Sequence, residues 1–387
     1  MRAVGIVAEY NPFHQGHAWP IRETRRLAGE DRAVVCVMSG NFVQRGVCAV
    51  TDKWTRAGLA LEHGADLVLE LPTPWAISSA EGFARGAVGA LRSTGVVDSI
   101  SFGSESGDLE GLRQVAACLE GESYRTALRG ELDKGFSFAK ARRQAVVDCV
   151  GKRGKLLDGP NDSLAVEYLR AAGEDLRPIA VHRWGAGHDA AETGDGYASA
   201  SAVRELVERG DWEQVNALLC PGDGARLRGA GVARMANGER AMLARLRTMG
   251  EADFAALPDS GEAEGLPDRL VRAARQARSL EQFYAVAKTK RYAHARLRRL
   301  ALWAFLGLTA ADRPGPCPPY LRVLGMNGRG KALLREMKET AALPVVVKPA
   351  KAGDLLEGES RLTDLYGLFL DKIRPCGMEY TTGPVIR

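Results

Sequence analysis

Five short and mostly apolar runs recur in the first half of the chain, and stretches with helical periodicity separate them. A strand with one solvent-facing side alternates apolar and polar residues, whereas parallel strands covered on both faces are apolar nearly throughout. The runs therefore predict buried parallel strands at residues 4–8, 33–38, 67–71, 99–102 and 179–182. Helices are predicted between them, for example at residues 54–62 and 80–91. This alternation predicts an α/β fold with a Rossmann-like, doubly wound parallel sheet.

The second half of the chain has a different pattern, with helical periodicity and no convincing strand before Val345. A glycine-rich and acidic stretch at residues 250–265 is typical of an exposed connection. We therefore expect two domains, an α/β domain at residues 1–210 and a mainly α-helical domain at residues 211–387. Helices are predicted at residues 238–248, 268–278, 280–287, 293–306 and 330–339.

Composition narrows the class of protein. Apolar residues make up 45% of the chain and charged residues 26%, as in an ordinary soluble protein. No apolar run is long enough to cross a membrane, and the N-terminus does not have the pattern of a signal peptide. The seven cysteines include no CxxC pair, so we expect neither a disulfide framework nor a zinc or other metal site. A reducing cytoplasm is the expected compartment.

Positive charge is concentrated in one part of the chain. Between Arg269 and Lys338 there are 16 lysines and arginines against three acids, a net charge of +13 in a chain whose total is +5. Such a segment indicates a polyanionic partner, although a solvated helical surface would give the same pattern. We expect RNA to contact a basic helix through Lys288, Lys290, Arg291, Arg296, Arg298 and Arg299.

The most specific local motif is an HxGH sequence that directly follows the first predicted strand. His14 and His17 lie three residues apart at the start of a predicted helix, so their side chains are neighbours. Ligands of open α/β sheets bind beyond the carboxyl ends of strands, where a helix N-terminus attracts phosphate. The imidazoles would stabilise charge on a nucleotide triphosphate, but helix capping or metal binding remain alternatives. Walker A and GxGxxG motifs are absent, so nucleotide binding depends on HxGH.

A second motif, at residues 199–204, has the sequence SASAVR. Ser199 or Ser201 would cap the helix that begins there, and Arg204 would lie one turn later, where its guanidinium can bind phosphate oxygens. An ordinary capped helix with a surface arginine is the alternative. The combination with HxGH favours the phosphate role.

Together the two motifs resemble the HxGH nucleotidyltransferase superfamily, and longer strings resemble its tRNA(Met) cytidine acetate ligase family. The matching strings are distributed over nearly the whole chain. They are VGIVAEYNPFHQGH at residues 4–17, MSGNFVQRG at 38–46, DKWTRA at 52–57, GADLVLELP at 64–72, FGSE at 102–105, PN at 160–161, KRYAHARLRR at 290–299 and YLRVLG at 320–325.

The resemblance implies an ATP-dependent ligase acting on tRNA. Acetate would be activated as acetyl-adenylate, and the acetyl group would pass to the wobble cytidine of elongator tRNA(Met), giving N(4)-acetylcytidine. Mg²⁺ is expected with the triphosphate, and no protein partner is required. The implied catalytic residues are His14, His17, Lys53 and Arg204. The implied ATP-binding residues are Val7, Ala8, Glu9, Tyr10, Asn11, Pro12, Phe13, His14, Gln15, Gly16, His17, Ala18, Trp19, Pro20, Gly103, Asn161, Arg183 and Ser201.

Some roles stay open at the level of sequence. Asn41, Gln44 and Arg45 follow the second strand and would face the acetyl group or the cytidine, or only form a structured loop. Two other functions compete with the ligase: a small-molecule adenylyltransferase of the same superfamily, and a non-catalytic, nucleotide-gated RNA-binding protein. The first would not need the basic segment, and the second would not need His14, His17 and Arg204.

Overall fold

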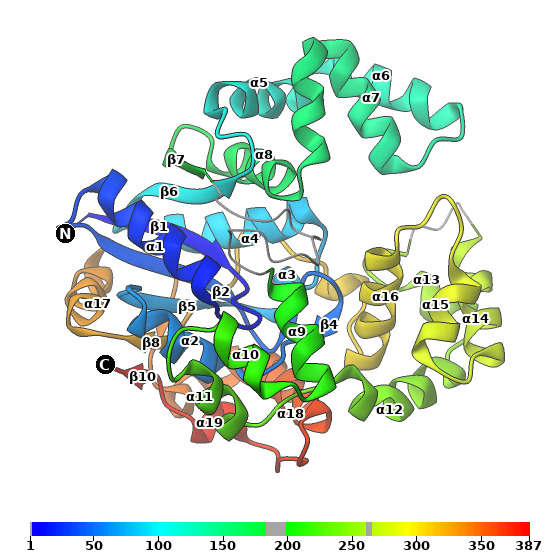
Figure 1. Ribbon diagram of the computed structural model, residues 1–387. Helices are drawn as coiled ribbons and strands as arrows, with labels where there is room; N and C mark the ends of the chain where they lie inside the picture. The colour runs from blue at the N-terminus through cyan, green and yellow to red at the C-terminus, as the bar shows by residue number, and fades with distance from the viewer. Residues whose placement is uncertain (1, 183–198, 261–264) are drawn as a thin grey trace.

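The computed structural model describes residues 2–182, 199–260 and 265–387 (Figure 1), and within them one large sheet forms the centre of the molecule. The strand order is β10-β8-β5-β2-β1-β6-β7, with β9 paired to β8. Strands β1, β2, β5, β6 and β7 are mutually parallel, and β8 is antiparallel to β5. The strands are β1 Ala3–Ala8, β2 Ala33–Ser39, β5 Leu67–Leu71, β6 Val97–Ser104, β7 Arg177–His182, β8 Leu321–Met326, β9 Val345–Val346 and β10 Val385–Ile386.

Helices cover both faces of this sheet, which confirms the predicted doubly wound α/β fold. One face packs on α1 (Gln15–Ala28) and α2 (Lys53–Glu62) through an apolar cluster that includes Ile6, Ile21 and Trp54. A second cluster joins the other face to several more helices. They include α4 Ala80–Ser93, α8 Pro160–Ala172 and α17 Gly328–Thr340. Because both faces are buried, the central strands are apolar nearly throughout.

Side chains at the first helical turns explain where several helices begin. Asp52 accepts a hydrogen bond from the Thr55 N–H at the start of α2, with a donor–acceptor distance of 2.8 Å. Ser199 does the same for Ala202, at 3.1 Å, at the start of α9 (Ala200–Arg209). Such caps satisfy N–H groups that have no partner within the helix. Ser199, and not Ser201, is therefore the cap of α9.

A second, helical lobe lies to one side of the sheet (Figure 1, green to dark yellow). Its own core includes Leu270, Phe283 and Trp303, all at most 1% exposed. Its helices are α12 Met235–Thr248, α13 Glu251–Ala255, α14 Leu266–Gln276, α15 Leu280–Ala287 and α16 His294–Leu306. Further helices project beyond β7 at the top of Figure 1, namely α5 Leu109–Glu120, α6 Glu122–Asp133 and α7 Phe138–Val150. In the described residues no helix is both long and apolar enough to cross a bilayer.

The C-terminal part of the chain returns to the sheet, contrary to the expected absence of strands before Val345. Strand β8 pairs with β5, and Val385 of β10 pairs with Gly325 of β8. Helices α18 (Glu357–Tyr366) and α19 (Met378–Thr381) belong to the same region. A single division at residue 210 therefore does not separate the sheet from the helical lobe, because the sheet is built from both ends of the chain.

Candidate active site

A cavity of about 470 Å³ lies where the winding of the sheet changes direction. From β1 the chain leads to β2 on one side, whereas β6 pairs with β1 on the other side. The chain continues from the carboxyl ends of β1 and β6 toward opposite sides of the sheet, to β2 and β7, and open α/β sheets bind ligands at this point. The volume is within the range of small-molecule sites. Backbone and side chains from α1, the hairpin of β3 (Phe42–Val43) and β4 (Val47–Cys48), α8, α9 and α16 complete the walls.

The loop after β1 forms the floor of the cavity. Tyr10 has a positive φ of 48°, a conformation that costs about 1–3 kcal/mol for a residue other than glycine and that clusters at functional sites. Its hydroxyl lies 3.4 Å from Cys36 Sγ, so the strained residue is anchored to β2. Asn11 Oδ1 accepts a hydrogen bond from the Val50 N–H at 2.8 Å. These contacts hold the backbone of the loop against the cavity.

The two histidines of the motif are brought together, but they differ in position. Their ring centroids are 3.9 Å apart. His14 is buried, is the N-cap of α1, and accepts the Gly16 N–H at Nδ1. His17 lines the cavity, and its ring makes an edge contact with Tyr10. Capping, which was an alternative for this motif, is therefore the observed contact of His14, while His17 has the direct access to a ligand.

Arg204 of α9 meets this loop from the opposite side. Its Nη1 donates to the Asn11 carbonyl oxygen at 2.6 Å, and its Nη2 donates to Ser201 Oγ at 2.9 Å. Arg204 and Ser201 both line the cavity, so the early and late sequence motifs form one site. Glu9 also lines it and accepts the Gln44 N–H at 2.8 Å. Burial raises the pKa of Glu9 and lowers the pKa of Arg204.

The wall beyond β6 contains Gly103 and Asn161, both predicted from the resemblance. The Glu105 carboxylate accepts the Asn161 N–H at 3.0 Å and the Asp162 N–H at 2.7 Å at the start of α8. In return, Asp162 accepts the N–H groups of Glu105 and Ser106 at 3.1 Å. This reciprocal pair fixes the end of β6 to the start of α8. The sequence strings FGSE at residues 102–105 and PN at 160–161 indicated this part of the site, but they did not reveal the pairing of Glu105 with Asp162.

The remaining wall is formed by the β3–β4 hairpin and by α16 of the helical lobe. Gln44, Arg45, Ala295 and Arg299 line the cavity here. Gly46 has a φ of 75°, and a Cβ atom on it would lie 2.5 Å from the Arg299 backbone nitrogen. Only glycine allows this approach of hairpin and helix. Arg299, expected to contact RNA, thus reaches the cavity itself. Apolar and hydroxyl residues that no sequence motif singled out also line the cavity, including Thr24, Phe83, Ser101, Phe102, Leu164 and Tyr168.

The expected ATP-binding residues divide into two groups. The residues of the 7–20 segment that line the cavity are Val7, Ala8, Glu9, Tyr10, Asn11, His17 and Pro20. The residues of the segment that lie outside the lining are Pro12, Phe13, His14, Gln15, Gly16, Ala18 and Trp19. Phe13 is fully buried in the core, and Gln15 Nε2 donates to the Leu219 carbonyl oxygen at 3.0 Å. Arg183 lies outside the described residues.

The resemblance implied a catalytic role for Lys53, but the structure pairs its side chain with carboxylates away from the cavity. The side chain is fully buried, and Nζ lies 2.7 and 2.8 Å from the two carboxylate oxygens of Glu70. A third oxygen, from Glu379 of α19, is 2.5 Å away. Arg322 of β8 also pairs with Glu379, at 3.0 Å. Lys53 therefore joins α2, the sheet and the C-terminal region, and it does not line the cavity.

The basic segment at residues 288–299 is only partly a helix, contrary to expectation. Residues 288–293 form a loop between α15 and α16, and Lys290 and Arg291 are exposed there. Lys288 Nζ instead donates to the Thr289 carbonyl oxygen at 2.9 Å. Arg296 Nε donates to the Asp259 carbonyl oxygen at 3.0 Å, and Arg296 Nη2 donates to the Ser260 carbonyl oxygen at 3.2 Å. The exposed basic surface is therefore smaller than the sequence suggested.

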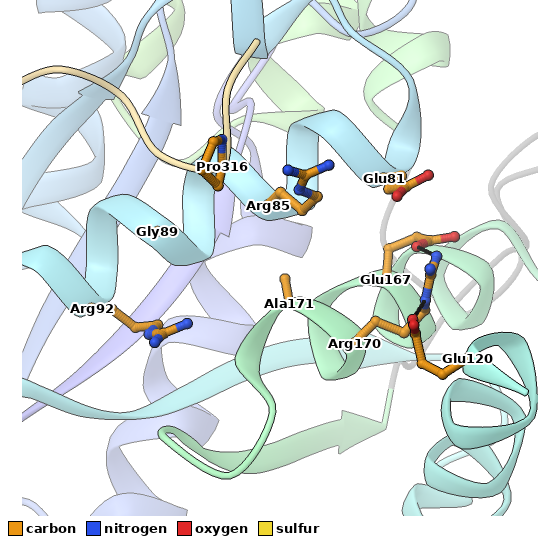
Figure 2. Close-up of a pocket in the computed structure, with 9 residues that line it drawn as sticks. All are labelled: Glu81, Arg85, Gly89, Arg92, Glu120, Glu167, Arg170, Ala171 and Pro316. Atoms are coloured by element: carbon orange, nitrogen blue, oxygen red, sulfur yellow. Dashed lines mark hydrogen bonds and ion pairs between the residues drawn. The ribbon is translucent and has the colours of Figure 1, made fainter.

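A second hollow, of about 330 Å³, lies between α4 and α8 (Figure 2). Arg170 pairs there with Glu120 and Glu167, each at 2.7 Å. Its lining contains no residue from a strand end, and carboxylates neutralise the arginine. The hollow therefore lacks the position at the strand ends that makes the first cavity the candidate nucleotide site.

Comparison with known proteins is consistent with this arrangement. The model of the HIGH Nucleotidyl Transferase family matches residues 1–379. A tRNA(Met) cytidine acetate ligase of Syntrophomonas wolfei is 36% identical, covering 100% of this chain and 99% of that protein. One from Acetivibrio thermocellus is 33% identical, with both chains fully covered. A crystal structure of Thermotoga maritima TmcAL bound with alpha-thio ATP has a TM-score of 0.90 at 33% identity, covering 100% of this chain and 99% of that one. The chain therefore belongs to the tRNA(Met) cytidine acetate ligase family of HIGH nucleotidyl transferases.

Proposed function

We propose that this protein is an ATP-dependent ligase that forms N(4)-acetylcytidine at the wobble position of elongator tRNA(Met). The observation that carries the proposal is the convergence of His17, Gly103, Asn161 and Arg204 on one cavity at the switch point of the sheet. Family membership supports the same reaction, since the relatives are named for it. The reducing cytoplasm, where tRNA is modified, is the proposed compartment.

In the first step ATP occupies the cavity. A carboxylate oxygen of acetate attacks the α-phosphorus, and the bond to pyrophosphate breaks, giving acetyl-adenylate. His17 and Arg204 stabilise the negative charge that develops on the phosphate oxygens. His14 acts through His17, because it fixes the start of α1 and contacts the second ring.

Magnesium fits this site as a companion of the triphosphate. Glu9 is the one carboxylate among the described lining residues, too few for an all-protein cage. Mg²⁺ usually binds through substrate phosphates with one or two carboxylates, and it would neutralise phosphate charge here. Every other role in the first step belongs to residues of the chain.

In the second step the exocyclic amine of cytidine attacks the carbonyl carbon of acetyl-adenylate. The bond between the carbonyl carbon and the phosphate oxygen breaks, AMP leaves, and the amine nitrogen loses a proton to solvent. A base within a folded RNA must first be unstacked and moved into the pocket. Gln44, Arg45 and Arg299 lie on the wall between the sheet and the helical lobe, so we assign them to the acetyl group and the incoming nucleotide. Lys290 and Arg291, both exposed, supply phosphate contacts outside the cavity.

Acetate-dependent exchange of labelled pyrophosphate into ATP tests the first step without tRNA. We expect exchange in the parent protein, and a loss of at least tenfold in His17→Ala, because one stabilising contact is worth about 10²–10³ in rate in comparable sites. His294→Ala, at an exposed histidine on α16, is the matched control and should keep full exchange. Undiminished exchange in His17→Ala would contradict the assignment.

Mass spectrometry of tRNA(Met), after incubation with protein, ATP and labelled acetate, tests the second step. Labelled N(4)-acetylcytidine at the wobble position is the expected product. Exchange driven by a phosphorylated small molecule in place of acetate would support the adenylyltransferase alternative. Binding of tRNA without any exchange would support the non-catalytic alternative.

A further inference from the structure

A short turn outside the cavity presents two potential metal ligands on one side. Cys220, Pro221, Gly222 and Asp223 form this turn, and the Asp223 N–H donates to the Cys220 carbonyl oxygen at 3.1 Å. Gly222 has φ 88° and ψ −17°, which with proline before it is the signature of a type II β-turn. The first and fourth residues of such a turn lie close together. Zinc-binding CxxC turns use the same spacing, with a second cysteine in place of Asp223.

A third ligand comes from a distant part of the chain. His63, the C-terminal residue that caps α2, places Nε2 2.9 Å from Asp223 Oδ2. The ligand atoms of His63, Cys220 and Asp223 all lie within 4.8 Å of one another. Cys220 and Asp223 are buried, at 8% and 2% exposure, and the His63 side chain is 23% exposed. Among the described residues this is the one group of three such ligands.

The chemistry of this group suits zinc. Zinc takes thiolate, imidazole and carboxylate ligands at about 2.0–2.3 Å, so tetrahedral ligand atoms lie about 3.3–3.8 Å apart. The observed separations, from 2.9 Å to at most 4.8 Å, bracket this range. An ion pair of His63 with Asp223 would account for two of the three groups, but not for the thiol beside them. No sequence pattern indicated this site, because no CxxC pair occurs and His63 is far from the turn along the chain.

We propose that His63, Cys220 and Asp223 bind one zinc ion, with water as the fourth ligand. Binding converts the Cys220 thiol to a thiolate and releases its proton to solvent. None of the three residues lines the cavity of the candidate active site, so the ion would take no direct part in the chemistry there.

The site lies directly behind the HxGH motif. The Phe13 ring stacks on the His63 ring, with centroids 5.1 Å apart and planes at 13°. Gln15 Nε2 donates to the carbonyl oxygen of Leu219, next to Cys220. A metal ion here would hold α2, the turn and the motif together. The predicted effect is a more rigid start of α1, which carries His17.

Metal binding to the full-length, reduced, metal-free protein tests the proposal without ATP, acetate or tRNA, so its outcome is independent of the proposed function. Zinc alone should bind with a stoichiometry of one and raise the unfolding temperature. Cobalt alone should give the absorption band of a thiolate–cobalt bond. Cys220→Ser should abolish that band and weaken zinc binding at least tenfold. Asp223→Asn should weaken zinc binding while it keeps the band.

The exposed cysteines supply matched controls, because Cys149→Ser and Cys376→Ser should bind both metals like the parent protein. Circular dichroism without metal shows whether each variant is folded, and a misfolded Cys220→Ser is replaced by Cys220→Ala for the same measurement. Zinc affinity that does not change in Cys220→Ser or Cys220→Ala would overturn the proposal. So would a parent protein without stoichiometric binding, or loss of the cobalt band in either control.

Discussion

The replacement Lys53→Met tests whether the buried ion cluster stabilises the fold. Methionine nearly preserves the side-chain length, but it removes the cation that both oxygens of Glu70 contact at 2.7 and 2.8 Å. Glu379 remains ion-paired with Arg322, at 3.0 Å, so Glu70 is the carboxylate that loses its cation. All four side chains are fully buried. Removing one partner of a buried ion pair costs about 3–5 kcal/mol, and we expect a loss of unfolding free energy in this range.

Urea unfolding followed by circular dichroism at pH 8 measures this loss, provided that the slope with urea is unchanged. Lys290→Met, at an exposed lysine, is the matched control and should change the free energy by less than about 0.5 kcal/mol. Adding Glu70→Gln to Lys53→Met should recover part of the loss, because a glutamine at this buried position needs neither the missing cation nor an added proton. A loss below about 1 kcal/mol in Lys53→Met would refute the reasoning.

Three further predictions concern the site, the ion cluster and the basic loop. Arg204→Lys keeps the charge but not the forked contacts, so KM for ATP in pyrophosphate exchange should rise at least tenfold while the unfolding temperature changes little. Burial raises the pKa of Glu70 to about 8, so the folded state retains a proton that the unfolded state loses near pH 4.5. The contribution of Glu70 to the free energy of unfolding should therefore fall as the pH rises from about 5 to 8. Urea unfolding of Glu70→Gln should lack that fall. The double variant Lys290→Glu, Arg291→Glu should weaken tRNA binding, and the slope of log binding constant against log salt concentration should become about two units shallower. Lys331→Glu on α17 is the control and should change neither quantity.

The sequence predicted the central strands because their burial on both faces leaves a local signature. It missed β8, where Arg322 interrupts a short apolar run that otherwise resembles a strand. Arg322 is tolerated there because Glu379 pairs with it, and no local pattern reveals a partner 57 residues away. Lys53 was misread for the same reason, since its neutralising carboxylates come from β5 and α19.

The candidate site was predicted best where one short motif supplies several contacts. His17, Gly103, Asn161, Ser201 and Arg204, which the resemblance implied for catalysis or ATP binding, all line one cavity. The other wall was harder to predict, because it depends on how the helical lobe docks against the β3–β4 hairpin. The basic segment was misjudged because hydrogen bonds to backbone carbonyl oxygens are invisible in a charge count. Lys288 and Arg296, for example, form hydrogen bonds within the protein, so they contribute to the structure of the lobe more than to a basic surface.

The sheet that both ends of the chain build has a consequence for protein synthesis. Residues 1–210 contain β5, but its outer edge pairs with β8, which is more than a hundred residues further along the chain. While the ribosome is still translating the helical lobe, that edge and the carboxylate of Glu70 have no C-terminal cover. The N-terminal half should therefore not mature as an independent unit during translation. A chain released from the ribosome at residue 210 should be more sensitive to protease than the full-length protein, because it lacks β8, β9 and β10.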